Sequence, residues 1–90
     1  MVRRVDAYDV SVWVTEEGFV FDDAECTKTH RCFEHDGEWH VALGDCIPIS
    51  VANMVYFAFT GVSCPRGCIG YLDGNHTNNH IKNLICRCAY

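Results

Sequence analysis

G-Y-L-D-G-N-H-T-N-N-H-I-K-N-L, residues 70 to 84, is the most informative stretch of this chain. The D-G-N at residues 73–75 predicts a tight turn, because Gly and Asn tolerate the positive φ angles that such turns need. Several residues after it can cap a helix, and Ile81 and Leu84 lie three apart, as on one helical face. The stretch therefore predicts a turn that leads into a helix.

The residues before it predict a helix at 48–61. Pro48 and Ser50 suit its start, and Gly61 suits its end. The expected buried face follows helical spacing and consists of Val51, Met54, Val55 and Ala58.

The N-terminal half, residues 1–47, predicts antiparallel hairpins. Valines alternate with other residues from position 10 to 14, a turn follows at Glu16-Glu17-Gly18, and Phe19 begins a second strand. Asp36-Gly37 is a strong hairpin signal between further apolar segments. Residues 62–90 complete the chain, and together these parts predict a single α+β domain over residues 1–90.

Composition supports a small folded protein. The chain has 90 residues, of which 49% are hydrophobic and 21% charged, a profile typical of a folded domain. No apolar run reaches the length of a membrane span, and the N-terminus lacks the apolar segment of a signal peptide. We expect a cytoplasmic protein without a membrane anchor, whose seven cysteines are mainly reduced thiols, some of them available to zinc.

The formal net charge is −5. A DNA-binding module usually presents a basic face to phosphates, and here only small basic patches are available, such as Arg3-Arg4, 28–31 and Arg66. The charge therefore disfavours DNA as the main partner.

The stretch at 70–84 resembles the core of HNH (ββα-metal) endonucleases, specifically the small phage and intron-encoded homing type. Leu72 to Asn75, Thr77 to Asn79, Ile81 and Asn83-Leu84 keep that pattern in register. Earlier segments resemble the same enzymes, so the likeness covers most of the chain. It implies N-terminal β-hairpins, a central helix and a ββα-metal unit over residues 62–90.

The two positions before Leu72 depart from the family. Tyr71 stands where the resemblance expects the histidine that activates water, and Gly70 stands where it expects an acidic metal ligand. A phenol titrates near pH 10 and is a poor base at neutral pH, and Gly has no side-chain oxygen. Asn83 matches an asparagine that holds the loop, with Asp73, Gly74 and Asn75 forming the turn.

The helix departs too. Ala52-Asn53 replace a His-Arg pair that, in the family, is suited to the nucleic-acid backbone, and Ile85 replaces a common arginine. These losses and the acidic charge both indicate a chain that has lost the nucleic-acid contacts of the family.

The resemblance also implies a structural zinc site. Zinc-stabilised HNH domains carry one cysteine pair before the hairpin and one after it, and four thiolates can close a tetrahedral site. Here the pairs are Cys64 with Cys68 and Cys86 with Cys88, each one residue away from the family spacing. The alternative is that they are free thiols or small buried hydrophobes.

Two other sets of residues are weaker candidates. His76 and His80, with Asp73, would share one face of a helix and could rebuild a catalytic centre for Mg²⁺ or Mn²⁺, or they are simply polar residues on the solvent side. A second set on the hairpins matches no common zinc pattern: Cys26, His30, Cys32, His35, His40 and Cys46.

The sequence favours a catalytically inactive HNH-like phage protein that binds or inhibits a host protein, for example a defence or nucleic-acid-processing factor, in the host cytoplasm. An acidic surface suits a basic protein better than it suits DNA. The alternative is an active metal-dependent DNA nicking endonuclease with relocated ligands, and a third possibility is an inactive module that still binds DNA.

Overall fold

The computed structural model describes residues 1–7, 10–30, 32–35, 37–43, 48–65 and 67–87, to which the structural statements below apply. The first sheet is antiparallel and three-stranded, with the order β1 (Val2–Ala7), β2 (Val10–Thr15) and β3 (Val20–Phe21). Val12 and Val14 are fully buried, whereas Ser11 and Trp13, which alternate with them, are half-buried. The expected hairpin is confirmed, and Gly18 in its turn has a φ of 96°.

Strand β1 was not expected from the sequence. It places Val5 in the core at 7% exposure. Arg4 and Asp6, on its outer side, bind each other and the Ser11 hydroxyl on β2, with Arg4 Nε 3.0 Å from Asp6 Oδ1.

The second sheet is also antiparallel and three-stranded, with the order β4 (Cys32–His35), β5 (Glu38–Val41) and β6 (Ile49–Ser50). Gly37, with a φ of 78°, lies in the turn of the β4–β5 hairpin, directly before β5. The hairpin agrees with the prediction, although Asp36 lies outside the described residues. The short strand β6 leads directly into the helix.

Helix α1 (Val51–Thr60) is the one predicted. The Ser50 hydroxyl accepts a hydrogen bond from the Asn53 backbone N–H at 3.4 Å. Gly61 ends the helix with a φ of 74°, and its N–H donates to the Phe57 carbonyl at 2.9 Å. Val51, Met54 and Val55 are buried as expected, together with Ala52.

The C-terminal part forms a third sheet of two antiparallel strands, β7 (Ile69–Tyr71) and β8 (Leu84–Cys86). The prediction of a helix after the D-G-N turn is wrong. The described residues there form only the 3-10 turn η1 (Ile81–Asn83). One reason is that the chain must turn back within this segment so that β8 can pair with β7. Asx side chains in the loop also bind backbone groups that a helix would use. No α-helix follows β8 in the part of the chain that the structure describes.

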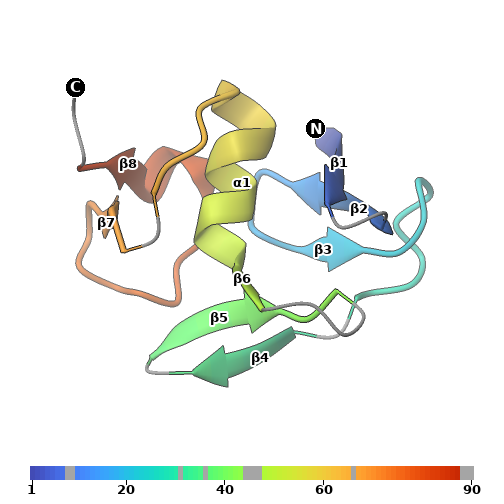
Figure 1. Ribbon diagram of the computed structural model, residues 1–90, viewed down its shortest axis with the longest axis horizontal. Helices are drawn as coiled ribbons and strands as arrows, with labels where there is room; N and C mark the ends of the chain where they lie inside the picture. The colour runs from blue at the N-terminus through green and yellow to red at the C-terminus, as the bar shows by residue number, and fades with distance from the viewer. Residues whose placement is uncertain (8–9, 31, 36, 44–47, 66, 88–90) are drawn as a thin grey trace.

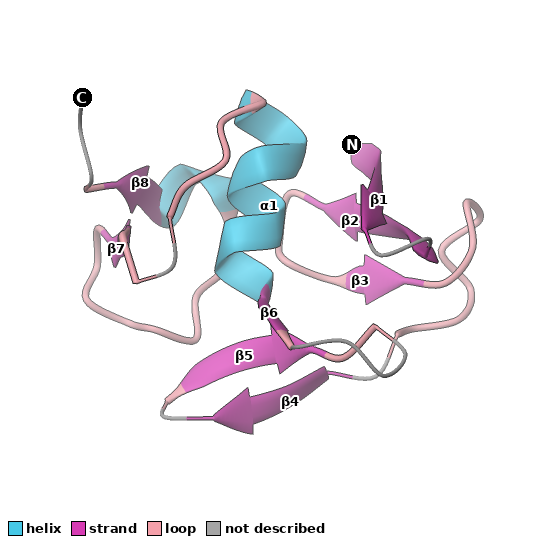
Figure 2. Ribbon diagram, viewed as in Figure 1, coloured by secondary structure: helices cyan, strands magenta, loops and turns pink. Residues whose placement is uncertain are grey.

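The three sheets surround helix α1 (Figures 1 and 2). β1–β3 lie on one side of α1, β7–β8 lie on the other, and β4–β6 lie at its N-terminal end. The helix contacts β1, β2, β5, β6, η1 and β8, so its buried face is the centre of a common core. The α+β class is thus confirmed, and none of the described helices is long and apolar enough to span a membrane.

Candidate functional site

The loop between β7 and β8 is held by the side chain of Asn83. Its Oδ1 accepts from the Asp73 N–H at 3.0 Å, and its Nδ2 donates to Asp73 Oδ1 at 2.9 Å and to the Asn78 carbonyl at 3.0 Å. Asn83 is 8% exposed. The Leu72 N–H also donates to the Asn83 carbonyl at 2.8 Å, so one residue closes the loop through its backbone and its side chain.

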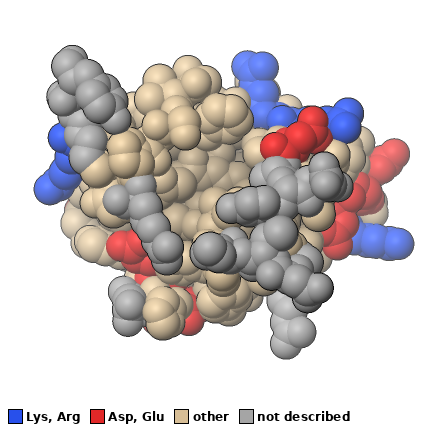
Figure 3. All heavy atoms as spheres, in the orientation of Figure 1, with Lys and Arg blue, Asp and Glu red and all other residues tan. Residues whose placement is uncertain are grey.

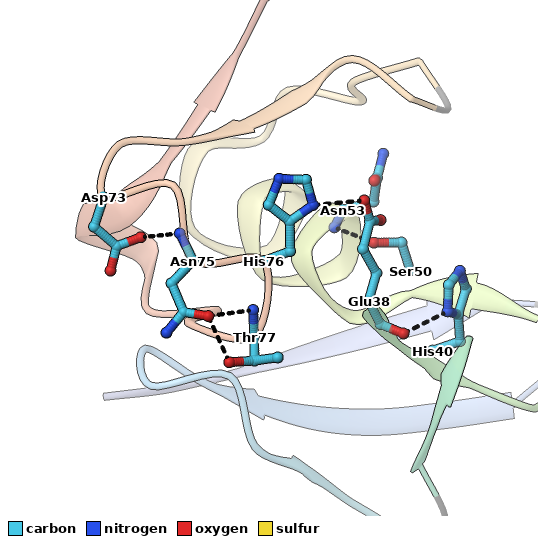
Figure 4. Close-up of polar contacts among 8 residues, drawn as sticks. All are labelled: Glu38, His40, Ser50, Asn53, Asp73, Asn75, His76 and Thr77. Atoms are coloured by element: carbon cyan, nitrogen blue, oxygen red, sulfur yellow. Dashed lines mark hydrogen bonds and ion pairs between the residues drawn. The ribbon is translucent and has the colours of Figure 1, made fainter. Parts of the chain in front are cut away.

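The Asp73 carboxylate is committed to this loop. It accepts from Asn78 Nδ2, the Asn75 N–H and Asn83 Nδ2 at distances between 2.8 and 2.9 Å. These donors hold the pKa of Asp73 below its ordinary value, so the carboxylate is ionised at neutral pH. Asn75 in turn caps Thr77, and Gly74 has a φ of 74° (Figure 4). Because its oxygens accept these hydrogen bonds within the loop, the carboxylate is poorly placed to bind a catalytic metal.

Tyr71, which stands where the sequence resemblance predicts a catalytic histidine, is buried at 6% exposure. Burial, together with the nearby Glu38 carboxylate, raises the pKa of its phenol to about 12. His76 stacks on the tyrosine ring with a centroid distance of 4.5 Å. Figure 4 shows its other contact, in which Nδ1 lies 3.3 Å from Glu38 Oε2. The result is a neutral phenol covered by an imidazole that is itself paired with a carboxylate of β5.

His80 has a different environment from His76. Residues 76–77 form a turn and 78–80 are irregular rather than helical, so the expectation that His76 and His80 share a helical face is wrong. His80 is the N-cap of η1, and its Nδ1 accepts from the Lys82 N–H at 3.1 Å. That nitrogen already has a partner, whereas His76 faces Glu38.

Gly70, which stands where the sequence resemblance predicts an acidic metal ligand, lies directly beneath the side chain of Arg87. A Cβ on Gly70 would lie 2.1 Å from Arg87 Nε. The side chain of Arg87 therefore fills the space that the Cβ of a metal-binding Asp or Glu at position 70 would need.

The helix positions that would face nucleic acid in the family are used inside the molecule. Ala52 is fully buried, and Asn53 Nδ2 donates to the Cys64 carbonyl at 2.8 Å. Asn53 thus ties α1 to the segment that precedes β7.

The predicted cysteine site is brought together in part. The Cys64 thiol is buried and lies beside that of Cys86; burial and this neighbour raise its pKa to about 11. Cys68 joins the same end of the hairpin, since its carbonyl accepts from the Arg87 N–H at 2.7 Å. Cys68 is disulfide-bonded, so a thiolate site that includes it requires reduction. Cys88 lies outside the described residues.

The described histidines and cysteines of the two N-terminal sheets do not form a metal centre. Both ring nitrogens of His30 have protein partners, Asp22 and the Ala42 carbonyl, the latter at 2.7 Å. The ring of His40 packs on Phe33 and His35. Cys32 donates to the His30 carbonyl at 3.6 Å, Cys26 lies in a separate exposed loop, and Cys46 falls outside the described residues. Within the described ranges, no group of three or more His, Cys, Asp or Glu side chains could hold a metal ion.

Two residues of this site were not found from the sequence, Glu38 and Arg87. Glu38 lies 38 positions from His76, and no local pattern links them. Arg87 reaches Gly70 because β7 and β8 pair in the register Gly70 to Ile85, which the strand pairing alone reveals.

No protein-family model, curated protein or solved structure matches this chain.

Proposed function

We propose that this chain is a catalytically inactive relative of the HNH endonucleases, phage-encoded, which binds and inhibits a host protein in the host cytoplasm. A defence or nucleic-acid-processing factor is the kind of target we expect. The observation that carries the proposal is the pair Gly70 and Tyr71. A nuclease needs a base and a metal ligand at these positions, and here they hold a neutral buried phenol and a glycine covered by Arg87.

The other candidate groups have structural partners. Asp73 accepts hydrogen bonds from the loop, and His80 caps η1. His76 is exposed, but its neighbours are a tyrosine ring and the Glu38 carboxylate. The alternative, an active Mg²⁺- or Mn²⁺-dependent nicking endonuclease, would have to use these same side chains.

An acidic edge supports a protein partner. We use this name for Glu16, Glu17, Asp22, Asp23 and Glu25, at the β2–β3 turn and in the loop after β3. In Figure 3, acidic side chains lie on the side of the molecule where β3 and this loop lie, with Lys and Arg side chains beside them. Phe19, between the two acidic segments, is 59% exposed. An exposed aromatic ring within negative charge suits a basic protein surface.

A structural zinc ion is part of the proposal. Cys64, Cys68 and Cys86 lie at one end of the β7–β8 hairpin, and Cys88 would be the fourth thiolate. As they lie among the described residues, these three side chains do not form a metal-binding group. A zinc site would therefore form only with Cys68 reduced and Cys88 joining the other thiols, since four thiolates close a structural site. Such an ion would stabilise the hairpin and would take no part in hydrolysis.

The nuclease assay separates the proposal from its alternative. Supercoiled plasmid is incubated with the protein and Mg²⁺ or Mn²⁺, using wild type, His76→Ala and His80→Ala. We expect no nicking by any of them. Nicking that EDTA abolishes and that either histidine variant loses would overturn the proposal in favour of the active enzyme.

Retention on immobilised DNA separates it from the DNA-binding possibility. We expect almost no retention even at low salt. Binding at low salt that weakens steeply as salt rises would instead indicate phosphate contacts.

The partner surface is tested by charge reversal. Proteins of the host extract that are cross-linked to wild type should be lost with Glu17→Lys/Glu25→Lys and retained with His76→Ala/His80→Ala. Loss of the same proteins with the histidine pair alone would place the binding surface on the hairpin loop and contradict the acidic edge.

A further inference from the structure

Strand β1 has one open edge. All of its residues pair with β2, from Val2 with Thr15 to Ala7 with Val10, and β1 is the last strand on that side of the first sheet. Within the described ranges, its other side makes no backbone hydrogen bond. The ladder with β2 is regular and the strand contains no proline, so two common protections of a sheet edge are missing. The edge can therefore pair with another strand.

A hollow of about 330 Å³ lies beside this edge. Residues of β1, of α1 and of the segments on either side of the helix line it, and no residue of β2 does. Val5 points into the core and Asp6 points outward, so a hollow that both of them line reaches around the edge opposite β2. Met54 and Phe57 form part of its wall, and Phe57 is 45% exposed. The hollow thus leaves room for a neighbouring strand and offers it apolar surface.

The charges on the outer side of β1 are opposite in sign. Arg4 and Asp6 are both exposed, and within one chain Arg4 Nε lies 3.0 Å from Asp6 Oδ1. Opposite charges that face each other across two strands stabilise the pairing, whereas like charges in that position destabilise it. The charges therefore decide how two copies of this strand can align.

One antiparallel register of two β1 strands satisfies both the faces and the charges. Paired residues point to the same face of a sheet, so the inner faces stay together only where a residue opposes one of the same direction. Among such registers, those centred on Arg3, Arg4 or Asp6 place a charged residue opposite its own copy. The register centred on Val5 instead places Arg4 of each chain opposite Asp6 of the other.

We propose that β1 pairs in this register with β1 of a second copy of the chain. The two three-stranded sheets then form one continuous sheet, with Val5 beside its own copy on the inner face and two Arg4–Asp6 pairs on the outer face. A second copy is favoured over a strand of another protein because β1 carries its own complement. The inference is independent of the proposed function, since β3 and the loop after it, which carry part of the acidic edge, lie across the sheet from β1.

The first test is the oligomeric state of the wild-type protein. We expect sedimentation equilibrium to show a reversible monomer–dimer equilibrium at concentrations between about 10 μM and about 1 mM, because the interface is small. In ¹⁵N-labelled protein, the amide signals of β1 should shift with concentration, whereas those of β7 should not.

Charge reversal tests the register. Arg4→Asp and Asp6→Arg should each weaken dimer formation roughly tenfold, because both outer pairs then have like charges. An equimolar mixture of the two variants should associate about as well as wild type, since every pair between unlike chains again joins opposite charges. Neither variant has the pair within its own chain, so this recovery cannot come from the stability of the single chain. Lys82→Asp, an exposed charge change in η1, is the control and should leave the dimer unchanged. A dispersed amide spectrum confirms that each variant folds.

Three results would overturn the inference. The first is a protein that stays monomeric at every concentration. The second is a dimer that both charge variants leave intact, which would place the interface on another surface. The third is a monomer whose β1 signals shift only when host extract is added, which would assign the edge to a strand of the partner protein. The plasmid, DNA-retention and cross-linking experiments test the proposed function separately.

Discussion

Arg87 crosses Gly70 so closely that a Cβ on Gly70 would lie 2.1 Å from Arg87 Nε and 2.9 Å from its Cδ. The contact joins the strand β7 to the residue that follows β8 and places a cation over the backbone of position 70. A metal-binding site needs negative oxygen ligands at such a place, and a fixed positive charge opposes the approach of a second cation.

Gly70→Ala should lower the free energy of unfolding by about 1 kcal/mol, because the arginine has to move away from the new methyl group. In an Arg87→Ala background the same substitution should be nearly neutral, since the obstacle is absent. Urea unfolding of the four proteins gives the coupling between the two positions. An equal cost in both backgrounds would mean that Arg87 does not fill the space over Gly70.

Asn83→Ala should be far more costly than changes elsewhere in the loop. The variant loses the hydrogen bonds to the Asp73 N–H, the Asp73 carboxylate and the Asn78 carbonyl, in a residue that is 8% exposed. We expect a loss of about 2–3 kcal/mol in the free energy of unfolding. Asn75→Ala, which removes exposed bonds to Thr77, is the control and should cost less than about 1 kcal/mol. Similar losses for both variants would contradict the central role of Asn83.

The hairpins at residues 10–21 and 32–41 and the helix α1 could be predicted because their signals are local. Val12 and Val14 alternate with their neighbours, Ser50 and Gly61 sit at the two ends of the helix, and both of these residues act as expected. In each case the residues that specify the element are the ones that form it.

The rest depends on contacts between distant residues. Strand β1 has the sequence V-R-R-V-D-A, in which Val5 is the buried residue, so no alternating pattern announces it. The 3-10 turn replaced a helix because Asn83 bonds to residues on the far side of the loop. In the candidate site, the absence of a base and a ligand at Tyr71 and Gly70 was visible from the sequence. Their covering by His76 and Arg87 depends on the fold.

The stability should depend on pH through His30. Burial lowers the pKa of His30, but the Ala42 carbonyl and the Asp22 carboxylate outweigh it, and the pKa lies above its ordinary value. Because the folded state holds the proton more tightly, this contribution is fully present below about pH 6.5 and is lost as the pH rises through the raised pKa. The free energy of unfolding, measured in urea from pH 6 upward, should therefore decline in wild type.

Two variants isolate this effect. Asp22→Asn removes the carboxylate and should reduce the decline, and His30→Gln should abolish the part that belongs to this residue. His30 also lines a cavity of about 360 Å³ together with Val20, Trp39 and Val51, so the same ionisation changes the charge at the wall of that cavity. An identical slope in wild type and His30→Gln would show that other groups account for the pH dependence.

Zinc should raise the melting temperature of the reduced protein. Reduction frees Cys68, which is disulfide-bonded in the structure, and a zinc ion held by thiolates at the end of the β7–β8 hairpin would stabilise the folded state in proportion to its affinity. We expect about one zinc per chain by elemental analysis. Cys64→Ser and Cys86→Ser should lower both the zinc content and the melting temperature, because these thiols are neighbours. Cys26→Ser, in the exposed loop after β3, should change neither. Zinc content that is unaffected by Cys64→Ser and Cys86→Ser would exclude this site.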